Sequence, residues 1–560
     1  LFALLRKKSS RAALFLIGGG SAILASSVIA PAITLTASVE GARELSQSFP
    51  VVPVVVAVLL ILFLIQRFRS GFVTNLSGPV MLIWFLMIGV AGMLQIIKMP
   101  EILTAVNPFY AFRMLSHHPE GLVLPGMIFL CVAGIEAAYQ EMGAYGKPAI
   151  RVAGLSVALM MMLSFFGQGA WLLSANNEPA AGNPFFEMIN DRFLAPAVII
   201  SIMAALVASQ SVINRAFTLV SEAVSLNFWP NIKILHPTQF KGQVYMPLIN
   251  WIIWAATTLF VIIFRKVTEM GPAYGLVLSF NMLSLTVLFA YYYRSHERIF
   301  GKRWLMIALL VLIETGYLFS VLYGFNNSEW FALFLTLFFL AVMLGWYFGR
   351  KIKNRYISFA NIADYTDLLT ELHRDNSVPI TATNLVYIIK ANRPDQVESK
   401  VIYSILHRQP KRAETYWFLR IDRVDEPDRF DYEFNPIIPG VLHRVDFHLG
   451  FKVEPRINLY FREVLEDLVA SKEISLSSSY ESLRKFSFTG DFKYILIDRV
   501  MLRDNKLTTL ENFLLSLHSF TRLFDITDER ALNLDLTNTI VEKIPVTLAQ
   551  PEGQRIIRAK

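Results

Sequence analysis

The sequence predicts an all-α polytopic membrane domain at residues 1–350, followed by a small α/β domain at residues 351–560. Hydrophobic residues make up 54% of the 560 residues and charged residues 17%, whereas a soluble domain is about a quarter charged. The apolar excess lies in long runs before residue 350. The net charge of +8 comes from Lys and Arg at the ends of those runs, which indicates loops beside a lipid bilayer and no nucleic-acid partner.

Membrane-spanning helices account for the apolar runs. A helix needs about 20 largely apolar residues to cross the hydrocarbon core of a bilayer. About ten segments are long enough, at residues 12–36, 50–66, 79–97, 122–142, 150–174, 194–224, 246–264, 271–293, 304–323 and 329–349.

The basic residues predict the orientation of these helices. Every second loop is rich in Lys and Arg, and the loops between them carry fewer, with Arg265 and Lys266 as the exception. Cytoplasmic loops carry the positive excess in membrane proteins. We therefore expect a multi-pass protein of the cell (inner) membrane, with both ends of the membrane domain and all of residues 351–560 in the cytosol.

The region after residue 350 mixes strand-like and helix-like patterns. Runs at 384–391, 415–424 and 494–500 predict strands, and the run at 458–474 predicts a helix. This region has no glycine-rich phosphate loop and no metal-ligand spacing, and we expect no cofactor. The one cysteine, Cys131, excludes an intrachain disulfide. Because the chain opens on "LFALLRKKSSR", we expect an N-terminal piece to be missing.

Glu136 is the main candidate for chemistry, because ionisable groups inside a membrane are costly and each is a functional candidate. On a helix, Tyr139 lies on the same face as Glu136. Gly134 permits a local break, where freed backbone carbonyls can coordinate a cation. Glu141 lies about 140° round the helix, nearer its end, and is a weaker candidate. The alternative reading of Glu136 is a structural acid bonded to neighbouring helices.

Two further segments carry polar groups. Pro31 removes a backbone donor from the first segment and leaves a carbonyl unpaired. The same segment supplies the hydroxyls of Ser26 and Thr34, with Glu40 near its outer end. In the segment 194–224, Ser209 and Gln210 form part of a polar stretch in mid-membrane. Packing and interhelical hydrogen bonding explain these groups as readily as a ligand does.

Two other polar residues lie within the apolar segments. Gln168 lies between two glycines, which indicates a close-packing site, and Glu314 is an intramembrane acid with structural and functional readings of equal weight. Oxygen ligands without a Cys/His cluster suit a hard, weakly bound ion or a small polar solute. Nothing in the sequence resembles a nucleophile–base pair, so we do not expect an enzyme.

Seven motifs occur in register along the membrane region. They are "VIAPAITLTASVEG" (28–41), "GIEAAYQEMGAYGKPAIR" (134–151), "FFGQGAWLL" (165–173), "NPFF" (183–186), "ASQSVINRAFTL" (208–219), "GQVYMPLINW" (242–251) and "PAYG" (272–275). Taken together, they resemble the Kup (KUP/HAK/KT) family of potassium uptake transporters. The resemblance spans the membrane region and continues more weakly into residues 351–560.

The resemblance implies twelve helices of the APC superfamily, with LeuT-type inverted repeats of five helices, and proton-coupled potassium uptake. The ten segments are then helices three to twelve, and the segment with Glu136 is the sixth, which is broken in that fold. We expect Glu136 to exchange the proton and to bind the ion with Tyr139, Thr34, Ser209 and Gln210. Ser26, Glu141 and Glu40 are secondary candidates.

The sequence departs from the family at two places. A stretch like "GDIGTSPLY" from the family's first helix, which should supply part of the ion site, is absent together with the second helix. Ser26 and Ala30 occupy positions where the family usually has an acid and a threonine. Both departures bear on ion affinity and proton coupling.

We therefore expect a potassium:proton symporter with a regulatory or assembly domain in the cytosol. The expected partners are potassium, protons, the bilayer, a second copy in a homodimer, and a nucleotide or other regulatory ligand at residues 351–560. One alternative is a relative that moves another small solute, such as an amino acid. The other is a non-transporting membrane sensor.

Overall fold

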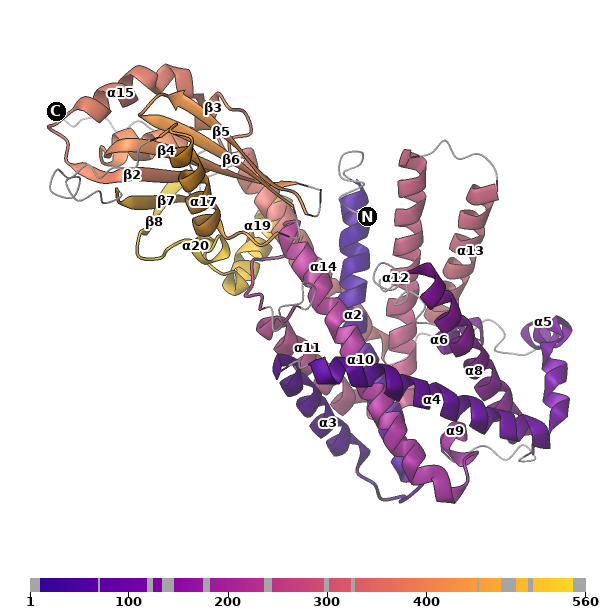
Figure 1. Ribbon diagram of the computed structural model, residues 1–560. Helices are drawn as coiled ribbons and strands as arrows, with labels where there is room; N and C mark the ends of the chain where they lie inside the picture. Colours follow the sequence, from indigo (N-terminus) through magenta and orange to yellow (C-terminus); the bar gives the residue numbers. More distant parts are fainter. Residues whose placement is uncertain are drawn as a thin grey trace, which may run out of the picture. The chain divides into compact units, whose positions relative to one another are not determined.

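The computed structural model describes residues 11–68, 71–117, 124–132, 146–174, 182–235, 244–296, 302–323, 328–424, 426, 428–450, 453–474, 490–501 and 507–546. The chain divides into two compact units. One is Leu1–Ser221 with Lys233–Ala341, and the other is Glu222–Ile232 with Val342–Lys560. Figure 1 follows both units along the sequence.

The first unit is built from helices that follow the predicted apolar segments. Of the segment 122–142, the structure describes only the part before residue 133. The longer helices are α2 (Arg11–Glu40), α3 (Val51–Ile65), α4 (Gly71–Lys98), α5 (Pro108–His117), α6 (Leu124–Val132), α8 (Lys147–Ser174), α10 (Asp191–Ser225), α11 (Pro247–Phe264), α12 (Val267–His296), α13 (Lys302–Tyr323) and α14 (Glu329–Arg355), with a short α9 (Pro184–Glu187). Among the described helices, eight are long and apolar enough to cross a membrane.

Glycines allow α4 and α8 to pack with their backbones in contact. A Cβ atom at Gly167 would overlap the backbone of Gly92, and a Cβ atom at Gly92 would overlap the carbonyl of Leu163. Gln168 lies beside this contact and donates to the hydroxyl of Ser164 at 3.2 Å. The predicted close-packing site at Gln168 is therefore confirmed, and its physical cause is the small-residue approach typical of membrane helices.

Helix α2 is the most buried of the eight candidate spans. It is rich in Gly, Ala and Ser, and it packs against α3, α11 and α12. Other spans leave large apolar side chains exposed, as α8 does with Leu155 and Leu159, which suits a surface that faces lipid. Small residues let α2 occupy the interior of the unit, so its polar side chains meet other helices and not lipid.

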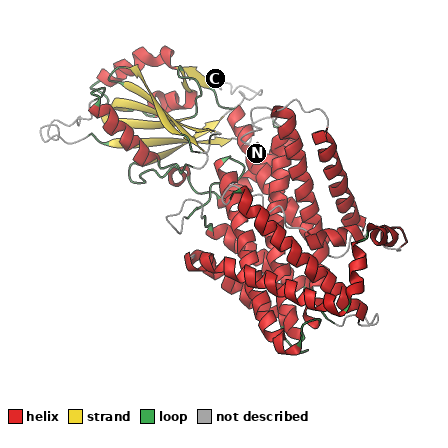
Figure 2. Ribbon diagram, turned by 45° about the vertical axis from the view of Figure 1, so that its right-hand side comes forward, coloured by secondary structure: helices red, strands yellow, loops and turns green. Residues whose placement is uncertain are grey.

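The second unit holds a six-stranded sheet in the order β5-β6-β4-β2-β7-β8. Its strands are β2 (Ile380–Ile389), β4 (Arg412–Val424), β5 (Phe430–Ile438), β6 (Leu442–Gly450), β7 (Phe492–Met501) and β8 (Thr539–Val546), and a separate two-stranded sheet pairs β1 (Phe359–Asn361) with β3 (Gln396–Glu398). Only β5 runs antiparallel to its neighbour in the large sheet. Figure 2 shows the strands in yellow with helices packed around them.

Two apolar cores cover the two faces of the large sheet. Alternate residues of β2 divide between them, with Leu385 and Tyr387 in one core and Val386 in the other, as the period of two in a strand requires. The helices of this unit are α15 (Thr366–Arg374), α16 (Ser399–Tyr403), α17 (Ile457–Ala470), α19 (Thr509–Thr521) and α20 (Asp528–Ala531). The three predicted strands and the predicted helix correspond to β2, β4, β7 and α17, so the α/β assignment is confirmed.

Candidate functional site

Two of the predicted site residues meet between α2 and α10. The hydroxyl oxygens of Thr34 and Ser209 lie 3.1 Å apart. Thr34 Oγ1 can also donate to the carbonyl of Ala30 at 2.9 Å. Either hydroxyl can donate in the bond between them, and both oxygens keep lone pairs that can accept a proton or coordinate a cation.

The surroundings of this pair are polar backbone and buried side chains. Helix α2 continues through Pro31, and Ser209 is buried. Thr257 of α11 donates to the carbonyl of Val28 at 3.0 Å, which ties a third helix to α2 about 9 Å along the helix from Thr34. Gln210 is half-buried. Its amide has no hydrogen-bond partner among the described residues, so it is available to a ligand.

The structure does not bring Ser26 or Glu40 to the pair. Ser26 precedes Thr34 by eight residues, which is about 12 Å along a helix, and Glu40 follows it by six, about 9 Å. Ser26 donates to the carbonyl of Ile23 in its own helix at 2.8 Å. Glu40 accepts from the backbone N–H of Val267 at 3.4 Å and so caps the first turn of α12.

The remaining predicted site residues lie outside the described part of the chain. These are Glu136, Tyr139 and Glu141. Their proposed roles in proton exchange and ion binding stay predictions.

Sequence reasoning missed Arg215 on α10, although it selected Asn214 as part of the polar stretch with Ser209 and Gln210. Within the described residues, Arg215 Nε and Asn214 Oδ1 are buried without a hydrogen-bond partner, and Arg215 has no ion pair. A guanidinium in a membrane-spanning helix is a functional candidate by the same rule that selected Glu136. The signal was present in the sequence, because Arg215 is the one basic residue in the long apolar run 194–224.

Glu314 lies away from the Thr34–Ser209 pair, between α13 and α12. Its Oε1 accepts from the hydroxyl of Thr286 at 2.8 Å, and its Oε2 is buried without a partner in the part of the chain that is described. One satisfied and one unsatisfied oxygen leave the structural and functional readings of this acid both open.

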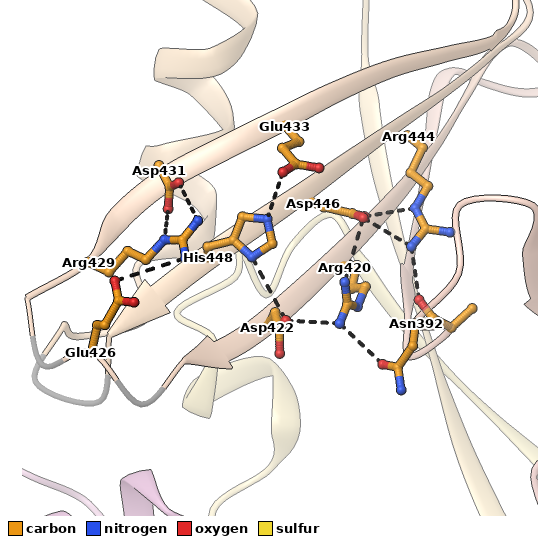
Figure 3. A network of polar contacts seen from close by, with 11 residues as sticks. Asn392, Arg420, Asp422, Glu426, Arg429, Asp431, Glu433, Arg444, Asp446 and His448 are labelled. Carbon is orange, nitrogen blue, oxygen red and sulfur yellow. Dashed lines mark hydrogen bonds and ion pairs between the residues drawn. The ribbon is translucent and has the colours of Figure 1, made fainter. Parts of the chain in front are cut away.

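The second unit carries a row of paired charges across β4, β5 and β6 (Figure 3). The buried guanidinium of Arg444 holds Asp446 at 2.8 Å, and Arg420 lies between Asp422 at 2.9 Å and Asp446 at 3.7 Å. His448 continues the row with Asp422 at 3.8 Å. Arg444 and Arg420 each have a carboxylate beside them, so neither guanidinium is left unpaired in this row.

Comparison with known proteins matches both regions of the chain to domains of potassium transporters. The K+ potassium transporter integral membrane domain matches residues 3–351, and the K+ potassium transporter C-terminal domain matches residues 382–543. A probable potassium transport system protein Kup from Cytophaga hutchinsonii is 38% identical over all of this chain and 86% of its own length. Proteins of the same name from Flavobacterium psychrophilum and Streptococcus agalactiae are 39% and 32% identical, over 97% and 99% of this chain and 84% of their own lengths.

Identity of this extent, over both the membrane helices and the α/β unit, exceeds what a shared fold alone would produce. It also includes the two helices on which Thr34 and Ser209 meet. The chain is thus a multi-pass membrane protein that belongs to the Kup family of potassium transporters.

Proposed function

We propose that this protein takes up potassium across the cell membrane in symport with protons, through an ion path that passes the Thr34–Ser209 pair. The observation that carries the proposal is the 3.1 Å contact between the hydroxyls on α2 and α10. Hard cations prefer oxygen ligands, and this pair offers two of them beside the unpartnered amide of Gln210. Its helices are among those that match the family's membrane domain.

Proton coupling requires a group that titrates in the ion path. We propose that Glu136 holds a proton when the site is without an ion and releases it when a cation approaches, because a nearby cation favours the ionised carboxylate. With Ser26 in place of the family's usual acid, fewer carboxylates share this role. Arg215 adds a fixed positive charge to the same helix as Ser209.

The finer architecture is also part of the proposal. We expect the APC-type arrangement with LeuT-type inverted repeats, of which the chain supplies about ten of twelve helices, and the soluble domain in the cytosol. The loops rich in Lys and Arg support that orientation. A cysteine introduced at residues 324–330 should react with an impermeant reagent from outside, and one at residues 361–367 should not.

The test of function uses the full-length gene in a host that lacks its own potassium uptake. Growth at limiting potassium, and potassium accumulation in proteoliposomes that is driven by an inward proton gradient, are the expected results. Growth without a response to the proton gradient would leave uptake in place and reject symport. Absence of both, with the protein folded in the membrane, would favour the sensor alternative. A homodimer and a regulatory ligand of the soluble domain stay predictions.

A further inference from the structure

The last turns of α14 are packed within the second unit. Gly345 and Gly349, one turn apart, lie against Leu517 and His518 of α19, and a Cβ atom at either glycine would overlap those side chains. The ring of Trp346 lies 4.8 Å from the ring of His518, centroid to centroid. Close approach of this kind fixes α19 on the end of α14.

Helix α10 ends in a Schellman motif within the same unit. The N–H of Phe228 donates to the carbonyl of Ala223 at 2.7 Å, and the N–H of Asn227 donates to the carbonyl of Val224 at 3.0 Å. Asn227 has a φ of 62°. This is the left-handed position that Gly or Asn takes in such a cap, so the end of α10 is a defined turn.

Both residues of the cap contact the end of α14. Arg350 Nη1 donates to Asn227 Oδ1 at 2.6 Å. The ring of Phe228 is fully buried and stacks on Tyr347 with 5.1 Å between centroids. A hydrogen bond to the αL residue and an aromatic contact to the next residue together hold the end of α10 against α14.

The chain after the cap is held by the C-terminal part of the protein. The N–H of Asn231 donates to Asp525 Oδ1 at 2.9 Å, and the N–H of Ile526 donates to the carbonyl of Asn231 at 2.8 Å. We call Glu222–Ile232 the cap segment. It is bonded on one side to α14 and on the other to the segment between α19 and α20.

We propose that the soluble domain restrains the carboxyl end of α10 through the cap segment and thereby limits the rate of transport. This inference rests on the function proposed above. Helix α10 is unbroken from Asp191 to Ser225 and carries Ser209, so a restraint on its end acts on a helix of the ion site. Transport requires the helices around a site to exchange between arrangements, and contacts made in one arrangement oppose that exchange.

The contacts of the cap segment are more than the soluble domain needs in order to stay attached to the membrane helices. The peptide bond after Arg355 already joins the soluble domain to α14, and nothing in that connection requires bonds to a loop more than a hundred residues earlier in the chain. The contacts from Asn227, Phe228 and Asn231 are all additional to it. They link the domain to α10 specifically.

The test compares cap variants of the full-length protein in proteoliposomes. Phe228→Ala removes the buried ring, and we expect faster hydrogen exchange in residues 220–232, an uptake rate at least twice that of the parent, and an unchanged preference for potassium over sodium. Asn227→Gly keeps the positive φ but removes the acceptor for Arg350, so it should act in the same direction with a smaller effect. It also serves as the test if Phe228→Ala does not fold.

The matched control is Asn533→Gly. Asn533 is another Asn in the second unit with a positive φ, of 53°, and it lies between α20 and β8; exchange and uptake should equal those of the parent. Faster exchange in the cap segment with an unchanged or lower uptake rate overturns the proposal, because the segment would then be a tether only. If the parent transports no potassium, both the proposed function and this inference are rejected. If the parent transports potassium and the cap variants take it up at the same rate as the parent, only the inference is rejected.

Discussion

The hydroxyl oxygens of Thr34 on α2 and Ser209 on α10 lie 3.1 Å apart, at residues 175 positions apart in the sequence. Thr34→Val keeps the shape of the side chain and removes its oxygen. Losing one polar contact costs about 1 to 1.5 kcal/mol, so we expect the potassium concentration for half-maximal uptake to rise about five- to twelvefold. Uptake assays over a range of potassium concentrations measure it.

The control for that variant is Thr336→Val. Thr336 is a half-buried threonine on α14 whose hydroxyl bonds to the carbonyl of Ala332 in its own helix at 2.8 Å. Equal effects of the two substitutions would show that any buried threonine matters as much, and Thr34 would then be a packing residue.

Glu136→Gln should abolish proton-driven potassium accumulation, because glutamine keeps the shape of glutamate and does not titrate. Glu141→Gln is the matched variant on the same stretch and should do less. The measurement is potassium accumulation in proteoliposomes at several external pH values. Accumulation by Glu136→Gln against the gradient, with the pH dependence of the parent, would make Glu136 a structural acid.

Loss of one member of the buried pair Lys411–Glu542 should destabilise the second unit more than replacement of both members by apolar residues. Lys411 Nζ lies 3.1 Å from Glu542 Oε1, and Glu542 Oε2 accepts from Ser404 at 2.6 Å. Removing one partner leaves a buried charge, so Glu542→Ala should destabilise the second unit by about 3 to 5 kcal/mol. The double variant Lys411→Met with Glu542→Leu should unfold closer to the parent in thermal denaturation. A double variant that is as unstable as the single one would contradict this.

The stability of the second unit should depend on the charge of Asp525. Burial raises the pKa of Asp525 to about 6, and the negative charge of Asp528 raises it further. The hydrogen bond from the Asn231 N–H and the positive charges of Arg350 and Arg522 lower it by less. Lys353 of α14 also faces this carboxylate. A raised pKa means that protonation favours the folded state, and that this gain is lost as the pH rises through about 6.

Asp525→Asn keeps an oxygen for Asn231 and removes the charge. It should therefore unfold at a higher temperature than the parent at pH 7.5, and the difference should shrink at pH 5 and close only as the pH falls to about 3.8, the ordinary pKa of an aspartate. A gap of the same size at both pH values would show that the charge is not responsible. His518 affects the parent and the variant alike. Burial, together with Lys353 and nearby arginines, lowers its folded-state pKa to about 3. At pH 5 the unfolded chain therefore binds a proton at His518 that the folded protein does not, and the resulting loss of stability cancels in the comparison.

Local pattern was enough to predict the elements of this protein. Apolar length predicted the long helices of the first unit, and the apolar run at 384–391 predicted the strand β2. The two glycines around Gln168 predicted a close-packing site, although not that α4 is the partner. These features depend on residues near one another in the chain.

The assembly of the site could be predicted only in part. Thr34 and Ser209 were selected separately as polar residues in apolar segments, and nothing in either segment shows that α2 and α10 bring them together. Ser26 was selected by the same rule and lies about 12 Å further along the helix. The contacts of the cap segment were missed because its partners, Arg350 and Asp525, are far away in sequence.

The cap segment also has a consequence for how the protein is made. Residues 222–232 belong to the second unit, yet the ribosome completes them before α11, α12, α13 and α14. During synthesis this stretch emerges without Tyr347, Arg350 or Asp525, because those partners lie later in the chain. The contacts that bury Phe228 therefore form only after residues 233–341 have been synthesised, so the second unit is completed last although it contains a segment that is made early.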